Sequence, residues 1–76
     1  MQQHKLLHPL EQDRVRRALS QVMNDDNLTF PMIAMQTGLH SCTLRRFMLN
    51  RKHMGINTIR TIVHFLSKRG YTLEEE

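Results

Sequence analysis

Apolar residues recur at steps of three and four positions along most of the chain, which is the spacing of one buried helix face. The first such stretch begins at Pro9, whose missing N–H suits the first position of a helix, and Glu11 and Asp13 favour the positive end of the helix dipole. Its apolar stripe consists of Val15, Ala18, Leu19, Val22 and Met23. The polar run 24–27 predicts the end of this helix. Four polar residues are expected largely outside the stripe: Arg14, Arg16, Arg17 and Gln21.

Two short helices are predicted next. Thr29 is a suitable N-cap for the first of them, and Pro31 fits the turn that follows. Gly38 is expected to end this helix in the left-handed conformation, which costs glycine little because it has no Cβ. The second of the pair is predicted from Ser41 to Leu49, and its inward positions are Leu44, Phe47 and Met48.

The last helix is predicted from Asn57 to Lys68, with Gly70 ending it. A basic turn precedes it from Asn50 to Gly55, in which Asn50 tolerates a positive φ. The helix is expected to bury four apolar residues and to carry Phe65 on a flank. The four are Ile59, Ile62, Val63 and Leu66. No stretch alternates with the two-residue period of a strand, so the pattern predicts an all-α domain.

Seventy-six residues are enough for one domain. Residues 1–8 show no clear period and are predicted to form a flexible N-terminal arm, followed by one domain over 9–73 and an acidic tail over 74–76. Cys42 is the only cysteine, which excludes an internal disulfide and favours a reducing compartment. No stretch approaches the roughly 18 apolar residues of a membrane span. We therefore expect a cytoplasmic protein without a membrane partner.

Charge is distributed unevenly along the chain. The formal net charge is +4, and the 47 residues from Asn27 to Leu73 contain no Asp or Glu. That stretch holds Arg45, Arg46, Arg51, Lys52, Arg60, Lys68 and Arg69. A solvated basic surface is the simplest interpretation, but solubility is usually achieved with mixed signs. A polyanionic partner is the favoured interpretation.

The stretch from Phe30 to Leu49 has residue types that a tight turn between two helices requires. Ala34 is small enough for the point where the helices cross, Gly38 accepts a positive φ four residues later, and Leu39 can cover the turn. Together with Leu28-Thr29 and the later run Thr58-Ile59, Ile62 and Leu66, this register resembles the Cro and phage-repressor family of helix-turn-helix domains. The chain departs from that family at His40, Met48 and Asn50, where the family usually has Ser or Thr, Glu and Gly.

The resemblance implies a compact four- to five-helix bundle of the lambda-repressor-like type, which binds an operator in double-stranded DNA as a homodimer. It implies a regulator of transcription, in most cases a repressor, found with the nucleoid when bound. The second motif helix would enter the major groove. Its base-reading candidates are His40, Ser41, Cys42, Arg45, Arg46 and Leu49. Arg45 is the first candidate to bind a guanine base. The alternative is that Arg45 and Arg46 both bind phosphates instead.

The phosphate-binding candidates implied by the same resemblance flank that helix. They are Thr29, Phe30, Arg51, Lys52, His53, Asn57 and Thr58. The arginines at positions 14, 16 and 17 are further alternatives at the flanks. Leu66, Tyr71 and Leu73 are candidate dimer-interface residues, with a role in capping the monomer's own core as the alternative.

Other function classes find less support. The sequence contains neither the paired carboxylates nor the phosphate-binding glycine loop that would indicate an enzyme. No cofactor is expected. His4 with His8, or His40 with Cys42, could contribute metal ligands, but a stable site needs three or four, and we predict none. Cys42 could also sense redox conditions. The principal alternative is a protein-binding module on the same fold, such as an antitoxin that binds a toxin or an antirepressor that binds a repressor.

Overall fold

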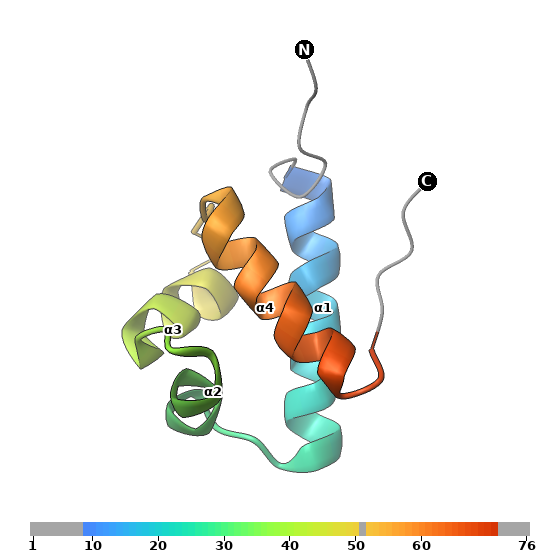
Figure 1. The fold of residues 1–76 in the computed structure, drawn as a ribbon. Helices are drawn as coiled ribbons and strands as arrows, with labels where there is room; N and C mark the ends of the chain where they lie inside the picture. The colour runs from blue at the N-terminus through green and yellow to red at the C-terminus, as the bar shows by residue number, and fades with distance from the viewer. Residues whose placement is uncertain (1–8, 51, 72–76) are drawn as a thin grey trace.

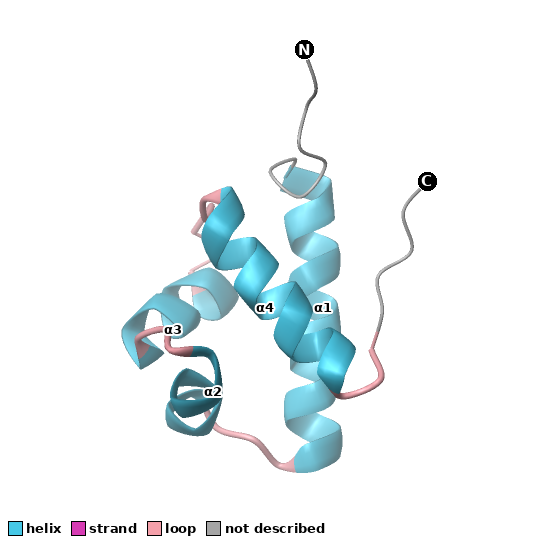
Figure 2. Cartoon of the chain, viewed as in Figure 1, coloured by secondary structure: helices cyan, strands magenta, loops and turns pink. Residues whose placement is uncertain are grey.

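Four α-helices form in the part of the chain that the computed structural model describes, residues 9–50 and 52–71. In chain order they are α1 (Pro9–Asp26), α2 (Phe30–Thr37), α3 (Ser41–Leu49) and α4 (Ile56–Lys68). These residues include no strand, so the predicted all-α class is confirmed (Figures 1 and 2). The predicted arm over 1–8 and the acidic tail over 74–76 lie outside the described residues.

The long helices α1 and α4 pack against each other and carry the short pair α2 and α3 at one side (Figure 1). α2 also packs against α4, and α3 also packs against α1, so each short helix is fixed by its partner and by one long helix. Only residues 38–40 connect α2 to α3. This connection holds the two short helices at a sharp angle (Figure 2).

All four helices contribute to one hydrophobic core. α1 supplies Val15, Leu19 and Val22 at the spacing expected from the sequence. The other core residues are Leu28, Ile33, Leu44, Phe47, Ile59, Ile62, Phe65 and Leu66. Because the apolar stripes of the helices meet in this cluster, the polar faces of the helices are left at the surface.

The face that α4 buries differs from the predicted one at two positions. Phe65 is only 6% exposed and belongs to the core, whereas Val63 is partly buried at its edge. The predicted flank position of Phe65 was therefore wrong. The guanidinium carbon of Arg69 lies 5.2 Å from the Phe65 ring centroid and covers the ring, which explains why this side chain is withdrawn from water.

α1 continues beyond its predicted end. The helix includes Asp25 and Asp26 and stops only at Asn27, which has a φ of 54°. The prediction that the whole polar run breaks the helix was wrong because both carboxylates are held by the far end of the chain. Tyr71 donates its hydroxyl to Asp25 at 2.7 Å, and Arg69 donates to Asp26 at 2.9 Å.

The ends of the shorter helices follow local capping rules. The Thr29 side chain accepts a hydrogen bond from the Met32 N–H, and Gly38 ends α2 with a φ of 80°, both as predicted. Gly70, at a φ of 86°, follows α4 in the same conformation. Asn50 does not use the positive φ expected of it: its φ is −98°, and its N–H donates to the Arg46 carbonyl at 3.1 Å.

Candidate nucleic-acid interface

α3 is anchored by two side chains and turns most of its remaining surface outward. Leu44 and Phe47 have no exposed surface, as their spacing predicts, while Met48 is partly buried beside them. His40 precedes the helix as its N-cap residue, but its side chain makes no capping hydrogen bond. The imidazole of His40 is therefore not tied to the helix backbone.

The six predicted base-reading residues lie together on the outer side of α3. At 100° per residue, the five that belong to the helix fall within an arc of about 140°. All six are exposed, and Leu49 keeps 66% of its surface in solvent. We call this surface the α3 face: His40, Ser41, Cys42, Arg45, Arg46 and Leu49.

The α3 face carries positive charge that the described residues do not neutralise. Among these residues the ion pairs join Arg14 to Glu11, Arg16 to Asp13 and Arg69 to Asp26, so neither Arg45 nor Arg46 takes part. α2, α3 and α4 contain no carboxylate side chain. Both guanidinium groups can therefore donate to an acceptor outside the protein, such as a base edge or a phosphate.

The phosphate-binding candidates at the start of α2 have structural roles of their own. Thr29 is exposed, but its hydroxyl oxygen accepts from the Met32 N–H at 3.4 Å and so caps the helix. Phe30 packs part of its side chain against the core. Pro31 has no N–H, and the N–H groups of Met32 and Ile33 donate to the side chain and the carbonyl of Thr29. The Phe30 N–H, rather than its ring, is therefore the donor that this turn can offer a phosphate.

The remaining phosphate candidates surround the start of α4. Lys52, His53 and Asn57 are exposed, and Thr58 is half-buried, whereas Arg51 lies outside the described residues. Gly55 is the N-cap residue of α4 and supplies no side-chain cap. The first N–H groups of α4 are thus left without a side-chain partner, which suits an external phosphate.

Two side chains from α1 hold this region, a role that the sequence pattern did not reveal. Gln12 is fully buried and forms two hydrogen bonds with the backbone of Met54. Its amide nitrogen donates to the Met54 carbonyl at 2.8 Å, and its amide oxygen accepts from the Met54 N–H at 3.0 Å. The same nitrogen lies 3.3 Å from Nε2 of His53. Gln12 therefore fixes the backbone that carries Lys52 and His53.

Arg16 makes the second link and is not on the solvent side of α1, contrary to the prediction. It is 9% exposed, and its Nε donates to the Phe47 carbonyl at 2.6 Å while Nη2 donates to the Lys52 carbonyl at 3.1 Å. Asp13 pairs with its Nη1 at 2.7 Å. Arg16 thus satisfies a carbonyl at the C-terminal end of α3, where a helix leaves its last acceptors unpaired.

The spacing of Gln12 and Arg16 contains the signal that could have identified them. Gln12 is three residues before Val15, and Arg16 is three residues before Leu19, so both lie along the apolar stripe of α1. A polar residue within an apolar stripe has to find a buried partner. Here the partners are backbone groups at the end of α3 and in the turn before α4, and these groups carry no sequence signature.

The C-terminal end of the described chain is fastened to the end of α1. The hydrogen bond from Tyr71 to Asp25, with a smaller contribution from partial burial and from the nearby negative charges, raises the pKa of Tyr71 to about 12. Tyr71 also packs against the core.

Leu66 has no exposed surface, so its predicted place in a dimer interface was wrong: α4 uses it for the core of the monomer. Leu73 lies outside the described residues.

None of the helices that the structure describes combines the length and the apolar character needed to cross a bilayer. Nor does that part of the chain bring together three or more His, Cys, Asp or Glu side chains in a group that could hold a metal ion. His4 and His8 lie outside it. Comparisons of the chain with protein-family models, with curated proteins and with solved structures found no match.

Proposed function

We propose that this chain is a sequence-specific, duplex-DNA-binding regulator of transcription in which α2 and α3 act as a helix-turn-helix. The short connection over 38–40, the left-handed Gly38 and the packing of the two helices support this assignment. The proposal joins these features to the resemblance of residues 28–73 to the Cro and phage-repressor family. It includes no catalytic role.

The observation that carries the proposal is the composition of the α3 face. Arg45 and Arg46 stand side by side on a helix that Leu44 and Phe47 anchor rigidly from below, and no described carboxylate competes for them. An α-helix fits the major groove of B-DNA, where arginine can donate to both acceptors of guanine. We assign base reading to Arg45 first, with Ser41 as a donor or acceptor and Cys42 against a thymine methyl.

Phosphate contacts are proposed on both flanks of α3. Along the chain, the Phe30 N–H at the start of α2 precedes α3, and Lys52, His53 and the first turn of α4 follow it. Such contacts position a reading helix without reading sequence. The two hydrogen bonds between Gln12 and Met54 and the contacts of Arg16 support the second flank because they hold its backbone against α1.

A homodimer on the operator is part of the proposal. One short helix reads too few base pairs for a unique site, and helix-turn-helix dimers double the contact by binding half-sites about one DNA turn apart. Since Leu66 is buried, Tyr71 is the described residue that stays a candidate for the interface, through the part of its ring that is not packed on the core. We propose that the dimer represses transcription by occupying its operator.

Selection of bound sequences from a pool of random duplexes tests the function directly. We expect the wild-type chain to enrich one motif with two related half-sites. A variant with Arg45→Ala and Arg46→Ala should enrich none, whereas Lys68→Gln, which removes a cation far from α3, should enrich the wild-type motif. Binding of all duplexes alike by the wild type would show that the basic surface has no reading function and would overturn the proposal.

A further inference from the structure

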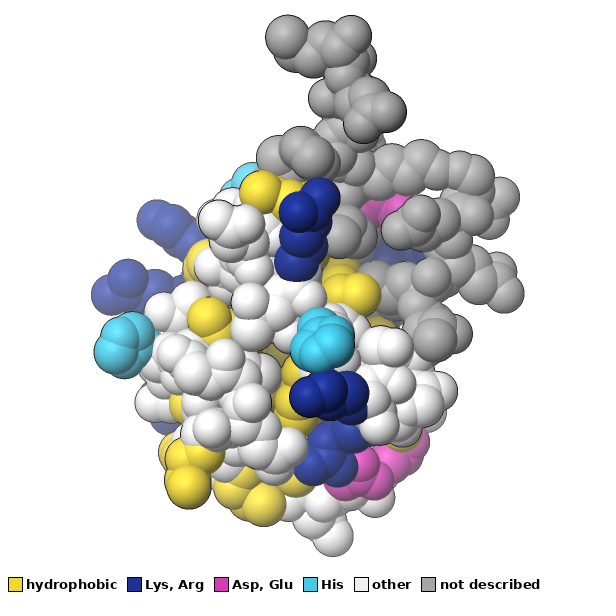
Figure 3. Space-filling model, viewed as in Figure 1, with side chains coloured by type: hydrophobic (Ala, Val, Ile, Leu, Met, Phe, Trp, Pro, Cys, Tyr) yellow, Lys and Arg dark blue, Asp and Glu magenta, His cyan; other side chains and the backbone are white. Residues whose placement is uncertain are grey.

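A second basic surface lies on α4, apart from the α3 face. Arg60, His64 and Lys68 are exposed and follow one another at four-residue steps, so they form one row along the helix. Figure 3 shows Lys, Arg and His side chains gathered in a row over α4. None of the three forms an ion pair or a side-chain hydrogen bond with another described residue. The DNA interface proposed above leaves this row unused.

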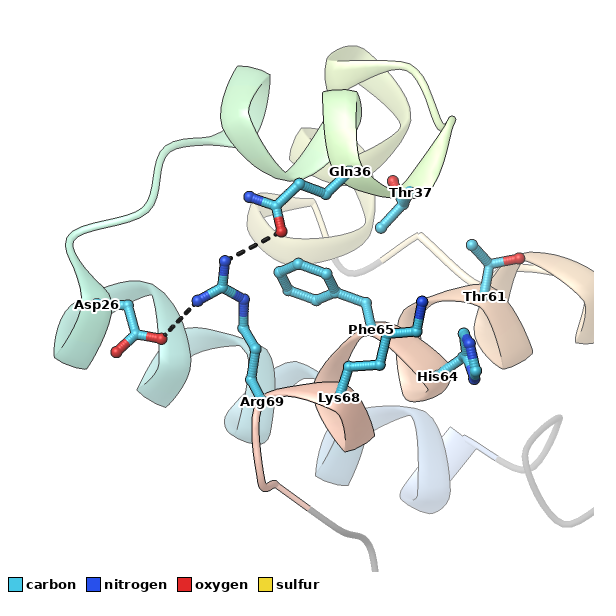
Figure 4. Close-up of a pocket in the computed structure, with 8 residues that line it drawn as sticks. All are labelled: Asp26, Gln36, Thr37, Thr61, His64, Phe65, Lys68 and Arg69. Atoms are coloured by element: carbon cyan, nitrogen blue, oxygen red, sulfur yellow. Dashed lines mark hydrogen bonds and ion pairs between the residues drawn. The ribbon is translucent and has the colours of Figure 1, made fainter.

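A cleft of about 710 Å³ opens beside the row, between α4 and the C-terminal part of α2 (Figure 4). Gln36 and Thr37 line it from α2, and Phe65 lines it from α4 between the row and the core. Arg69 closes one end by donating to Asp26 at 2.9 Å and to Gln36 at 3.0 Å. The only carboxylate that lines the cleft among the described residues is thereby neutralised.

The α2 side of this region is apolar and exposed. Met35 keeps 87% of its surface in solvent and Met32 keeps 42%. Met32 lies between Met35 and Gln36 on the surface of α2, because it is three positions before the one and four before the other. Gln36 lines the cleft, so the two methionines continue from its edge onto the outer side of α2. Exposed methionines are common at protein-binding surfaces, where the flexible thioether adapts to its partner.

We propose that these features form a docking surface for an acidic amphipathic helix of a partner protein. We call it the α2–α4 surface and define it by Met32, Met35, Arg60, His64 and Lys68. Four residues of helix rise about 6 Å, so carboxylates four apart on the partner helix would match the cationic row step for step. The partner's apolar side chains would cover the methionines and enter the cleft above Phe65, as an amphipathic helix does in a groove.

A nucleic acid fits the α2–α4 surface less well than an acidic helix does. A phosphate backbone would pair with the row but would leave Met35 without a partner. A helix with one acidic and one apolar side covers both parts at once. This inference does not depend on DNA binding through α3, because the two surfaces share no residue.

The test uses a fluorescent peptide of about four helical turns, with Glu residues four apart on one side and Leu residues on the other. A matched peptide with Gln in place of Glu is the first control. We expect saturable, one-to-one binding of the Glu peptide to the full chain, with amide shifts in NMR confined to α2 and α4. The Gln peptide should bind at least about fivefold more weakly, since each exposed ion pair contributes modestly.

Variants of the protein locate the binding surface. Arg60→Gln with Lys68→Gln should weaken peptide binding about fivefold, and Met35→Gln should weaken it several-fold. Lys52→Gln, which removes an exposed cation outside the α2–α4 surface, should leave peptide binding unchanged. Circular dichroism checks that each variant is folded, and operator binding by the double variant should match the wild type.

Four results would overturn the inference. The first two are binding of the Gln peptide as tightly as the Glu peptide, and a loss of peptide affinity in Lys52→Gln equal to that in the variant with Arg60→Gln and Lys68→Gln. The other two are NMR amide shifts centred on α3, and displacement of the bound peptide from the α4 row by random duplex DNA. A free chain that already self-associates through Met35, seen in sedimentation as a dimer that Met35→Gln dissociates, would assign the surface to a second copy instead. Failure of peptide binding with intact operator selection would refute this docking surface alone.

Discussion

The guanidinium carbon of Arg16 lies 4.5 Å from the centroid of the Phe47 ring, while the Nε of the same side chain donates to the Phe47 carbonyl at 2.6 Å. Arg16 thus contacts both the side chain and the backbone of Phe47, which lies near the end of α3. Because Phe47 is also a core residue, this contact sets the position of α3 relative to α1.

Replacement of Arg16 by alanine should destabilise the fold. The change leaves the Phe47 and Lys52 carbonyls without their donor and removes the cover of the Phe47 ring, so we expect a loss of roughly 2–4 kcal/mol. Urea denaturation measures it. Arg17→Ala is the matched control: Arg17 is exposed, and its loss should change stability by less than about 0.5 kcal/mol. Equal effects of the two changes would contradict the buried role of Arg16.

Gly38 should be more sensitive to substitution than Gly55. The φ of 80° at Gly38 is strained for any residue with a Cβ, although nothing lies within 4 Å of where that atom would be. Gly38→Ala should therefore cost about 1 kcal/mol or more from backbone strain alone. Gly55→Ser is the comparison, because Gly55 has a φ of −71° at the N-cap of α4, where serine is favoured. Thermal unfolding should show a loss in the first variant and none in the second.

Tyr71 should titrate well above the usual range of a phenol. Its pKa of about 12 lies above the ordinary 10.0, so the folded state favours the protonated form. The stabilisation is complete below pH 10.0 and is lost as the pH rises through about 12. Tyr71 is the only tyrosine, so the absorbance of phenolate reports it directly in native and denatured protein. Asp25→Asn should move the native midpoint down toward that of the denatured chain, and an unchanged midpoint would contradict the contact.

Base reading and phosphate binding should separate in the DNA affinities of two variants. Arg45→Ala should cost about 1–3 kcal/mol on the selected operator and much less on scrambled duplex. Lys52→Ala should weaken binding to both and flatten the slope of log K against log salt by nearly one unit, about 0.9 for each phosphate that the protein no longer neutralises. Titrations of both duplexes at several salt concentrations give these values. An intact ratio of operator to scrambled affinity in Arg45→Ala would move base reading to another residue of the α3 face.

The sequence predicted best what depends on neighbouring residues. Thr29 and Gly38 were identified because helix caps act within four residues, and Leu44 and Phe47 were identified because one helix period defines their face. The roles of Gln12 and Arg16 were missed because their partners are backbone groups more than thirty residues away. Val63 and Phe65 were exchanged because both border the apolar arc of α4, and the structure places Phe65 in the core beneath Arg69 and Val63 at the edge of the core.

The extension of α1 to Asp26 has the same origin. Aspartate and asparagine disfavour a helix interior when only local competition is considered. In the structure, Tyr71 and Arg69 hold the two carboxylates, and these contacts cross more than forty residues of sequence. The exposure of the α3 face could be predicted from the sequence because these positions are the complement of a strong apolar pattern.

The side-chain ties of α1 have a consequence for the order of folding. Gln12 reaches across 42 residues to Met54, and Asp25 across 46 to Tyr71, so both contacts must close long loops before they contribute stability. α2 and α3 are adjacent in the chain and can pair at small entropic cost. We expect the folding nucleus to form among α2, α3 and α4, with docking of α1 as the late step that makes this loosely ordered group of three helices rigid.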